Sequence, residues 1–331
     1  MHKPSKTRQR RTILGTTAGV VAMVLGCMAP AHAESFPSSR ITLVVAFPAG
    51  GTNDAVARYL ADPLAKRLGQ PVVVENVGGA AGAIGAAQVK RAQADGYTLL
   101  LGSVNETVLA PITNAAVKYS YKDFTPVAKV GSTAFVVVGR KDLPASSIDD
   151  VLRLAREKPG TLTFGSTGVG SYQQVVMESI QRIAGVSMVH VPYRGGGPML
   201  TDLLGSQIDL AVSLPTTMLP QINRQSVKAF GVTGQKRDPA APDLPSVNEG
   251  KVIKGVDFVF WFGVFAPNGL QDERRTQLQE AVTDVLKDEQ VRKQLEAAGL
   301  TVATQSEQQT LPAFIAEEDA KLRAAAQGIN F

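Results

Sequence analysis

Residues 41–68 hold the pattern that most constrains the fold: an apolar run, a glycine turn and an amphipathic segment follow one another directly. The Val-rich run Ile41–Phe47 predicts a buried strand. After the turn at Gly50 and Gly51, apolar residues recur every three or four positions and predict a helix. The start of such a helix presents free backbone N–H groups and the positive end of the helix dipole at one point. The stretch therefore predicts an anion site.

The same pattern occurs a second time in residues 161–185. Thr161–Phe164 predicts a strand, residues 165–170 form a turn of mostly small residues, and Ser171 is a residue type that caps helices. Strands that alternate with helices indicate parallel sheets, whose ligands lie beyond the carboxyl ends of the strands. Two copies in one chain favour two similar α/β lobes with facing helix N-termini. A cleft between such lobes suits an anion.

Residues 1–33 predict a secretory signal peptide that is not part of the fold. A basic start precedes the apolar segment 13–28, and Ala31-His32-Ala33 matches the small-x-small pattern before a cleavage point. Arg10-Arg11 also resembles a twin-arginine signal, so two export routes stay open. A lipid anchor at Cys27 is the less favoured alternative, because the preceding residues match a lipoprotein box only loosely.

The charge of the predicted mature chain gives no support for nucleic acid or an acidic membrane as a partner. The sequence has 34 Lys and Arg and 29 Asp and Glu, and five of the basic residues precede residue 34, which leaves 29 of each sign. Cys27 is the only cysteine, so no disulfide and no thiol chemistry are expected after cleavage. His190 is then the only histidine, so no metal site built on His or Cys and no cofactor is expected.

Enzyme signatures are missing from the sequence. It contains no nucleophile-elbow motif, no P-loop and no dinucleotide-binding fingerprint, and its acidic residues form no tight cluster. His190 lies inside an apolar run, where a buried, hydrogen-bonded structural histidine is favoured over a catalytic base. No catalytic residue is therefore expected, and a secreted α/β hydrolase or isomerase remains the alternative class.

Several segments resemble the Bug family, the periplasmic solute receptors of tripartite tricarboxylate transporters. They are 45–54 (VAFPAGGTND), 72–76 with 78–85, 95–100 (DGYTLL), 190–198 (HVPYRGGGP) with 202–204, and 261–267 (WFGVFAP). The similarity covers essentially the whole mature chain. It implies a periplasmic, monomeric receptor that captures a di- or tricarboxylate or an aromatic acid and delivers it to the membrane permease subunits. Presentation of the ligand to a two-component sensor is the alternative.

The resemblance also implies the type II periplasmic binding protein fold, in which two α/β lobes close on a ligand. Lobe 1 would comprise residues 34–133 and 256–331, and lobe 2 residues 134–255. Family members hold one ligand carboxylate with backbone N–H groups and ordered water at two facing loops. Carried over by position, the expected ligand-binding residues are Ala49, Gly50, Gly51, Thr52, Asn53 and Asp54, then Ser166, Thr167, Gly168 and Ser171, with Ser103 and Tyr193 lining the same cleft.

Two positions leave the interpretation open. Asp54 fits a helix-capping acid and a ligand contact equally well. Ser213 follows a predicted strand where the family often has an acidic residue. If Ser213 faces the ligand, an amine has no acidic partner there, which favours a plain carboxylate or a small aromatic acid over an amino acid. The loops 102–114 and 213–219, which would complete the pocket, cannot be folded from the sequence.

Overall fold

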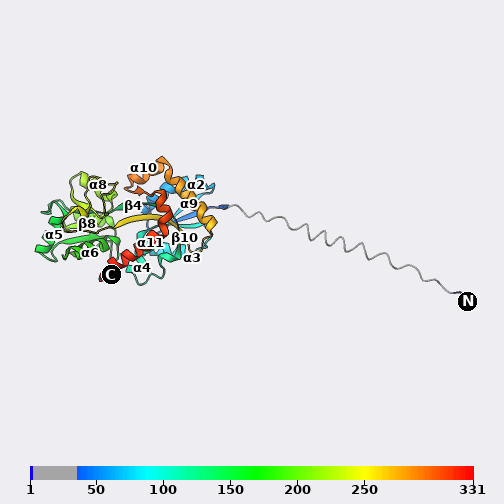
Figure 1. Cartoon of the computed structure of the whole chain (residues 1–331), viewed down its shortest axis with the longest axis horizontal. Coiled ribbons are helices and arrows are strands. Elements are labelled where there is room, and N and C mark those ends of the chain that lie inside the picture. The colour runs from blue at the N-terminus through cyan, green and yellow to red at the C-terminus, as the bar shows by residue number, and fades with distance from the viewer. Residues whose placement is uncertain (3–35) are drawn as a thin grey trace. The chain divides into compact units, whose positions relative to one another are not determined.

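Two β-sheets with their helices divide residues 39–331 into two lobes within one compact unit (Figure 1). The computed structural model describes residues 1–2 and 36–331. Apart from Met1 and His2, the predicted signal peptide lies outside the described residues, and so do its twin-arginine motif and Cys27. The α/β fold predicted from the alternation of strands and helices is confirmed.

Lobe 1 contains a six-stranded mixed sheet in which β1 pairs in parallel with β2 and β3, and β10 runs antiparallel. Its strands, in spatial order, are β11 (Thr301–Val302), β4 (Phe124–Ala134), β10 (Val259–Pro267), β3 (Thr98–Ser103), β1 (Ile41–Val45) and β2 (Val72–Asn76). Its helices are α2 (Thr52–Leu68), α3 (Ala83–Arg91), α4 (Ala110–Thr113), α9 (Asp272–Lys287), α10 (Glu289–Ala297) and α11 (Gln305–Ala326), with the short 3-10 turns η1 (Ala80–Gly82) and η3 (Tyr121–Asp123) and the π-helix η2 (Asn105–Leu109).

Lobe 2 contains a five-stranded sheet in which β6 pairs in parallel with β7 and β8, and β5 runs antiparallel to β8 and β9. In spatial order the strands are β7 (Val189–Pro192), β6 (Thr163–Ser166), β8 (Leu210–Ser213), β5 (Val136–Arg140) and β9 (Val227–Val232). Its helices are α5 (Ile148–Glu157), α6 (Tyr172–Ala184), α7 (Gly196–Leu204) and α8 (Pro215–Asn223), with the short turn η4 (Val247–Glu249). The two predicted strand–turn–helix units are thus β1–α2 and β6–α6. The predicted residue bounds of the lobes stay a prediction.

Thr233 joins the two segments that cross between the lobes. Phe135 alone separates β4 of lobe 1 from β5 of lobe 2, and the chain returns through Phe258, directly before β10. The buried Thr233 hydroxyl donates to the Phe258 carbonyl (2.7 Å) and accepts from the Phe135 N–H (3.1 Å). The Thr233 backbone bonds the same two residues, with its N–H donating to Phe135 and its carbonyl accepting from Phe258, both at 2.9 Å. The two crossings therefore meet at one residue.

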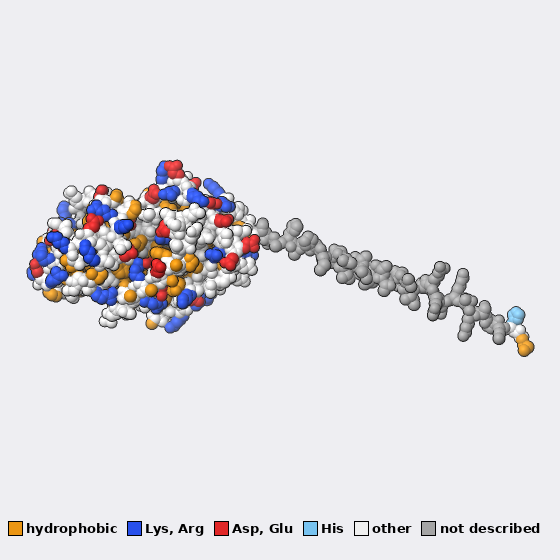
Figure 2. All heavy atoms as spheres, viewed as in Figure 1, with side chains coloured by type: hydrophobic (Ala, Val, Ile, Leu, Met, Phe, Trp, Pro, Cys, Tyr) orange, Lys and Arg blue, Asp and Glu red, His pale blue; other side chains and the backbone are white. Residues whose placement is uncertain are grey.

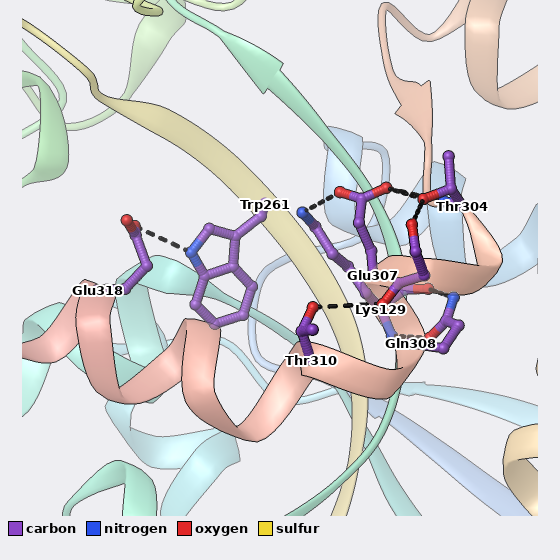
Figure 3. Close-up of polar contacts among 8 residues, drawn as sticks. Lys129, Trp261, Thr304, Glu307, Gln308, Thr310 and Glu318 are labelled. Carbon is purple, nitrogen blue, oxygen red and sulfur yellow. Dashed lines mark hydrogen bonds and ion pairs between the residues drawn. The ribbon is translucent and has the colours of Figure 1, made fainter.

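The C-terminal helix α11 is fixed to lobe 1 by polar contacts with two central strands (Figure 3). The Gln308 amide accepts from the Lys129 N–H (2.7 Å) and donates to the Lys129 carbonyl (2.8 Å), so it pairs with the backbone of β4. The fully buried Trp261 of β10 donates its indole N–H to Glu318 (3.2 Å). Because these bonds lie along the length of α11, the helix is held against lobe 1 over several turns.

The last turn of α11 contacts lobe 2 instead. The guanidinium of Arg182, on α6, donates to the carbonyl oxygens of Ala325 (2.7 Å) and Gln327 (3.1 Å). Carbonyl groups at the end of a helix have no partner within it, and a cation is favourable there. Helix α11 is therefore a third connection between the lobes, beside the two crossing segments.

We expect the Thr233→Val substitution to destabilise the protein by about 2–4 kcal/mol, because it keeps the side-chain shape but leaves the Phe135 N–H and the Phe258 carbonyl each short of a partner. Urea unfolding measures this change. The matched control is Thr310→Val, which removes an exposed hydroxyl on α11 and is expected to change the free energy of unfolding by less than about 0.5 kcal/mol. Equal, small effects of both substitutions would contradict the role of Thr233.

Candidate ligand-binding cleft

A cavity of about 730 Å³ lies between the two lobes. Lobe 1 lines it with residues 47–53, Gly79, Ala81, Gly82, Asn105 and Ala110, and lobe 2 with residues 167–171, Gln173, residues 194–196, Ser213, Leu214 and Thr217. Phe135 and Phe260, at the two crossings, complete the wall. The cavity therefore lies at the carboxyl ends of strands from both sheets, where α/β proteins bind ligands.

Five helices begin at the edge of this cavity. The residues that precede α2, α3, α6, α7 and α8 all line it: Gly51, Gly82, Ser171, Gly195 and Leu214. Only Ser171 caps its own helix with a side chain, accepting from the Gln174 N–H at 3.4 Å. The other four have no side-chain cap. Ala83, which opens α3, donates its N–H to the Ala80 carbonyl, and α8 begins with Pro215, which has no N–H, so the N–H groups left for a ligand are mainly those of α2 and α7. Together with the helix dipoles they make the cavity favourable for an anion.

Arg194 is the only charged side chain among the described residues that line the cavity, and no acidic side chain lines it. Arg194 is exposed and forms no ion pair within the described part of the chain. A guanidinium binds a carboxylate through two parallel hydrogen bonds. The wider surface, by contrast, shows both signs of charge interspersed (Figure 2). Arg194 lies within the motif 190–198 but is not among the twelve binding residues predicted from the sequence.

Eight of the twelve residues expected to bind the ligand line the cavity. They are Ala49, Gly50, Gly51, Thr52, Asn53, Thr167, Gly168 and Ser171. The structure thus brings the two predicted loops together across one space. Asp54, Ser103, Ser166 and Tyr193 do not line it. Direct contact of any of the twelve with a ligand stays a prediction.

Asp54 is bonded to its own loop. One carboxylate oxygen accepts from the Gly50 N–H at 2.9 Å, and both accept from the Arg58 side chain at 3.0–3.1 Å. The bond from Arg58, with that from Gly50, holds the pKa of Asp54 at about 2, although burial acts in the opposite direction. The structure therefore favours the first interpretation of Asp54, an acid at a helix start, and this acid fixes the Gly50 turn.

The hydroxyl groups of Ser103, Ser166 and Tyr193 are bonded within their own lobes. Ser103 donates to Glu106 at 2.5 Å, and Tyr193 donates to Asp202 at 2.8 Å. The Ser166 oxygen lies 2.6 Å from Nε2 of His190, and its hydroxyl donates to the Gly168 carbonyl. These three residues therefore stabilise the segments next to the cavity and do not line it themselves. His190 is half-buried and stacked on Phe164, and burial lowers its pKa.

Two asparagines that line the cavity carry buried polar atoms without a partner. Among the described residues, Nδ2 of Asn53 and Oδ1 of Asn105 are buried and make no hydrogen bond. Buried polar groups in proteins are nearly always paired, so such atoms point to a bound partner. Ser213 also lines the cavity. The position at which the family often has an acidic residue therefore contributes a serine to the cavity lining. Asn105 lies in a loop that sequence patterns could not fold.

Asn105 opens the π-helix η2, which is fixed by a buried acid. The fully buried Glu106 accepts from both the backbone N–H and the hydroxyl of Ser103, at 2.5 Å each. It forms no ion pair in the described ranges, and burial raises its pKa to about 7. The Tyr119 hydroxyl donates to its backbone carbonyl at 2.7 Å. Short π-helices frequently lie at functional sites, and this one fixes the position of Asn105.

An α/β cleft of this kind, lined by helix N-termini from two lobes, defines a solute-binding receptor. The family model described as "Tripartite tricarboxylate transporter family receptor" matches residues 56–331, so the chain belongs to that family of periplasmic receptors, of which the Bug proteins are members. The family and its structural neighbours are solute-binding receptors and not enzymes. No helix among the described residues is both long and apolar enough to span a membrane.

Several curated relatives match most of the chain. A UPF0065 protein of Agrobacterium vitis, from the TAR-I ttuE-ttuC' intergenic region, is 36% identical over 286 residues, which cover 86% of this chain and 82% of the relative. BugT of Bordetella pertussis is 32% identical over 312 residues, which cover 93% of this chain and 94% of BugT.

Solved structures of periplasmic receptors are also similar to this chain. The periplasmic binding protein BugD is 30% identical with a TM-score of 0.75, covering 88% of this chain and 98% of BugD. Rpa4515 of R. palustris, solved with adipate, is 30% identical with a TM-score of 0.78, covering 88% and 97%. MatC of Rhodopseudomonas palustris, solved with bound malate, is 29% identical with a TM-score of 0.77, covering 88% and 100%. The predicted Bug-family membership is confirmed.

We expect the Glu106→Gln substitution to flatten the pH dependence of stability. The folded protein keeps a proton on Glu106 up to about pH 7, whereas the unfolded chain releases it near 4.5. Stability from this group is therefore present at low pH and lost as the pH rises towards 7. Glutamine stays neutral and can still pair with Ser103. Between pH 5 and pH 8, the free energy of unfolding of the variant should therefore rise by about 2–3 kcal/mol relative to that of the wild type.

Urea unfolding at both pH values measures that difference. The exposed Glu280→Gln serves as the matched control and should show the wild-type pH dependence. A Glu106→Gln variant that follows the wild type at both pH values would show that the acid is ionised in the folded protein.

Proposed function

We propose that this receptor captures a small di- or tricarboxylate or aromatic acid in the periplasm and delivers it to the permease subunits of a tripartite tricarboxylate transporter. One observation carries the proposal: five helix N-termini and Arg194 surround a cavity that no acidic side chain lines. The relatives solved with adipate and with malate support a carboxylate, since both ligands are dicarboxylates. The aromatic side chains of Phe47, Phe135 and Phe260 supply apolar walls.

In the proposed mechanism the ligand bridges the lobes. A carboxylate accepts from backbone N–H groups of Gly51–Asn53 in lobe 1 and of Thr167 and Val169 in lobe 2, because the N–H groups of Gly50, Gly168, Gly170 and Ser171 are bonded within their own loops. Only a conformation that brings both loops to the ligand makes both sets of bonds, so binding shifts the protein towards that conformation. The crossings at Phe135 and Phe258 provide the two hinges. Export of the mature chain after cleavage near Ala33 is part of the same proposal.

A thermal-shift screen tests the ligand class. Purified chain 34–331 should melt at a higher temperature with small carboxylates or aromatic acids, in proportion to ln(1 + [L]/Kd), and about 2.7 kcal/mol of added stability is expected at a hundredfold excess over Kd. Amino acids should give smaller shifts, because no acid lines the cavity to pair with an ammonium group. The bound compound must be recovered unchanged. A compound that is consumed, or shifts by uncharged sugars alone, would overturn the proposal.

We expect Gly51→Val to block binding without unfolding the protein. Gly51 has φ −85°, which L-residues adopt freely, and an added Cβ would have only the Pro48 carbonyl oxygen nearby, at 3.7 Å. The valine side chain would instead fill the approach to the helix start. Calorimetry should show a loss of affinity of at least tenfold, about 1.4 kcal/mol or more, with little change in melting temperature.

Gly197→Val is the matched control for this experiment. Gly197 has open space around the position of its missing Cβ and does not line the cavity, so the variant should bind normally. Unchanged affinity in Gly51→Val would exclude the Gly50–Asn53 loop as an anion site.

A further inference from the structure

We propose that Asn105 selects a hydroxy acid, by accepting a hydrogen bond from a hydroxyl group of the ligand while the ligand carboxylate binds at the helix N-termini. This inference rests on the proposed function and names the ligand more closely. It starts from one atom, Oδ1 of Asn105: the residue lines the cavity, and this atom is buried and has no hydrogen-bond partner among the residues that the structure describes.

Asn105 is held in place by its neighbours. Next to it, Glu106 accepts two hydrogen bonds from Ser103, and Thr107 donates its hydroxyl to the Ser103 carbonyl at 2.6 Å. The backbone of η2 is therefore tied at three points to the end of β3. Because the backbone is fixed on this side, Asn105 keeps its place at the cavity wall. An acceptor held at a binding surface is a means of discriminating between ligands.

The chemistry of the acceptor excludes a plain carboxylate as its partner. An amide oxygen can only accept, and an ionised carboxylate has no proton to donate. A hydroxyl group donates and carries no charge. An ammonium group donates too, but its charge would oppose the helix N-termini and Arg194, and no acidic side chain lines the cavity to balance it. A hydroxyl on the same molecule as the carboxylate satisfies both parts of the site.

Asn53 supplies the complementary group from the neighbouring strand end. Strands β1 and β3 pair in parallel, with Val45 opposite Leu101, so the segments that follow them lie side by side. Asn53, in the first turn of α2 after β1, carries an unpartnered donor, Nδ2, whereas Asn105, directly after β3, carries the unpartnered acceptor. One donor and one acceptor on residues that line the same cavity match a hydroxyl beside a carboxylate, since the hydroxyl donates and the carboxylate accepts.

Calorimetry with pairs of acids that differ by one hydroxyl tests the inference: malate and succinate, citrate and tricarballylate, and mandelate and phenylacetate. In at least one pair the wild type should bind the hydroxylated acid about tenfold or more tightly. Asn105→Leu, of similar size but without an acceptor, should reduce that ratio to about twofold or less. Asn53→Leu is the matched control, because it removes a donor to the carboxylate and should weaken both acids of the pair alike.

Melting curves of each variant without ligand show whether it is folded, and the wild-type ratio tests the inference even if a variant is not. Carboxylates that bind wild type with no preference for the hydroxylated acid, or a preference that survives in Asn105→Leu, would overturn the role of Asn105 and leave the proposed function intact. If none of the six acids bound, the proposed function would fail for these classes and this inference with it.

Discussion

The uncapped helix starts around the cleft are the feature on which the rest of the structure depends. Four of the five helices that begin there have no side-chain cap; away from the cavity, α5 and α10 are capped by Ser147 and Asp288, and α9 is not capped. A cap satisfies N–H groups within the chain, and its absence leaves them for a ligand. Glycine at Gly51 and Gly195 leaves this backbone open to approach. The site is thus made of backbone, and the sheets serve to hold five helix starts at one place.

The parts of the fold that sequence patterns predicted are those with strong periodicity. The unit 41–68 has a helix start, a glycine turn and a regular apolar face, and the structure has β1 and α2 there. Ser171 was predicted to cap a helix and does so. Both signals are local: each depends on neighbours within a few positions of the chain. Local signals located the two loops, and their repetition in the chain predicted two lobes with facing helix N-termini, as the resemblance to the Bug family also implied.

What the sequence could not supply depends on contacts between distant segments. Ser103, Ser166 and Tyr193 are polar residues near the predicted cleft, but their hydroxyls turn to partners in their own lobes. Asn105 lies in a π-helix, which has no periodic signal of its own. Arg194 is an exposed cation in a glycine-rich loop, where a solvated side chain is the usual expectation. Its place at the cavity follows only from the positions of both lobes.

The C-terminal helix α11 links the relative position of the two lobes to the hydrogen bonds at its own C-terminal end. A helix of 22 residues is about 33 Å long, and α11 is fixed to lobe 1 by Gln308 and Glu318 while its last turn contacts lobe 2 through Arg182. A rotation of the lobes apart would separate that guanidinium from the carbonyls of Ala325 and Gln327. The hydrogen bonds of the final turn therefore depend on whether the two halves of the receptor are together.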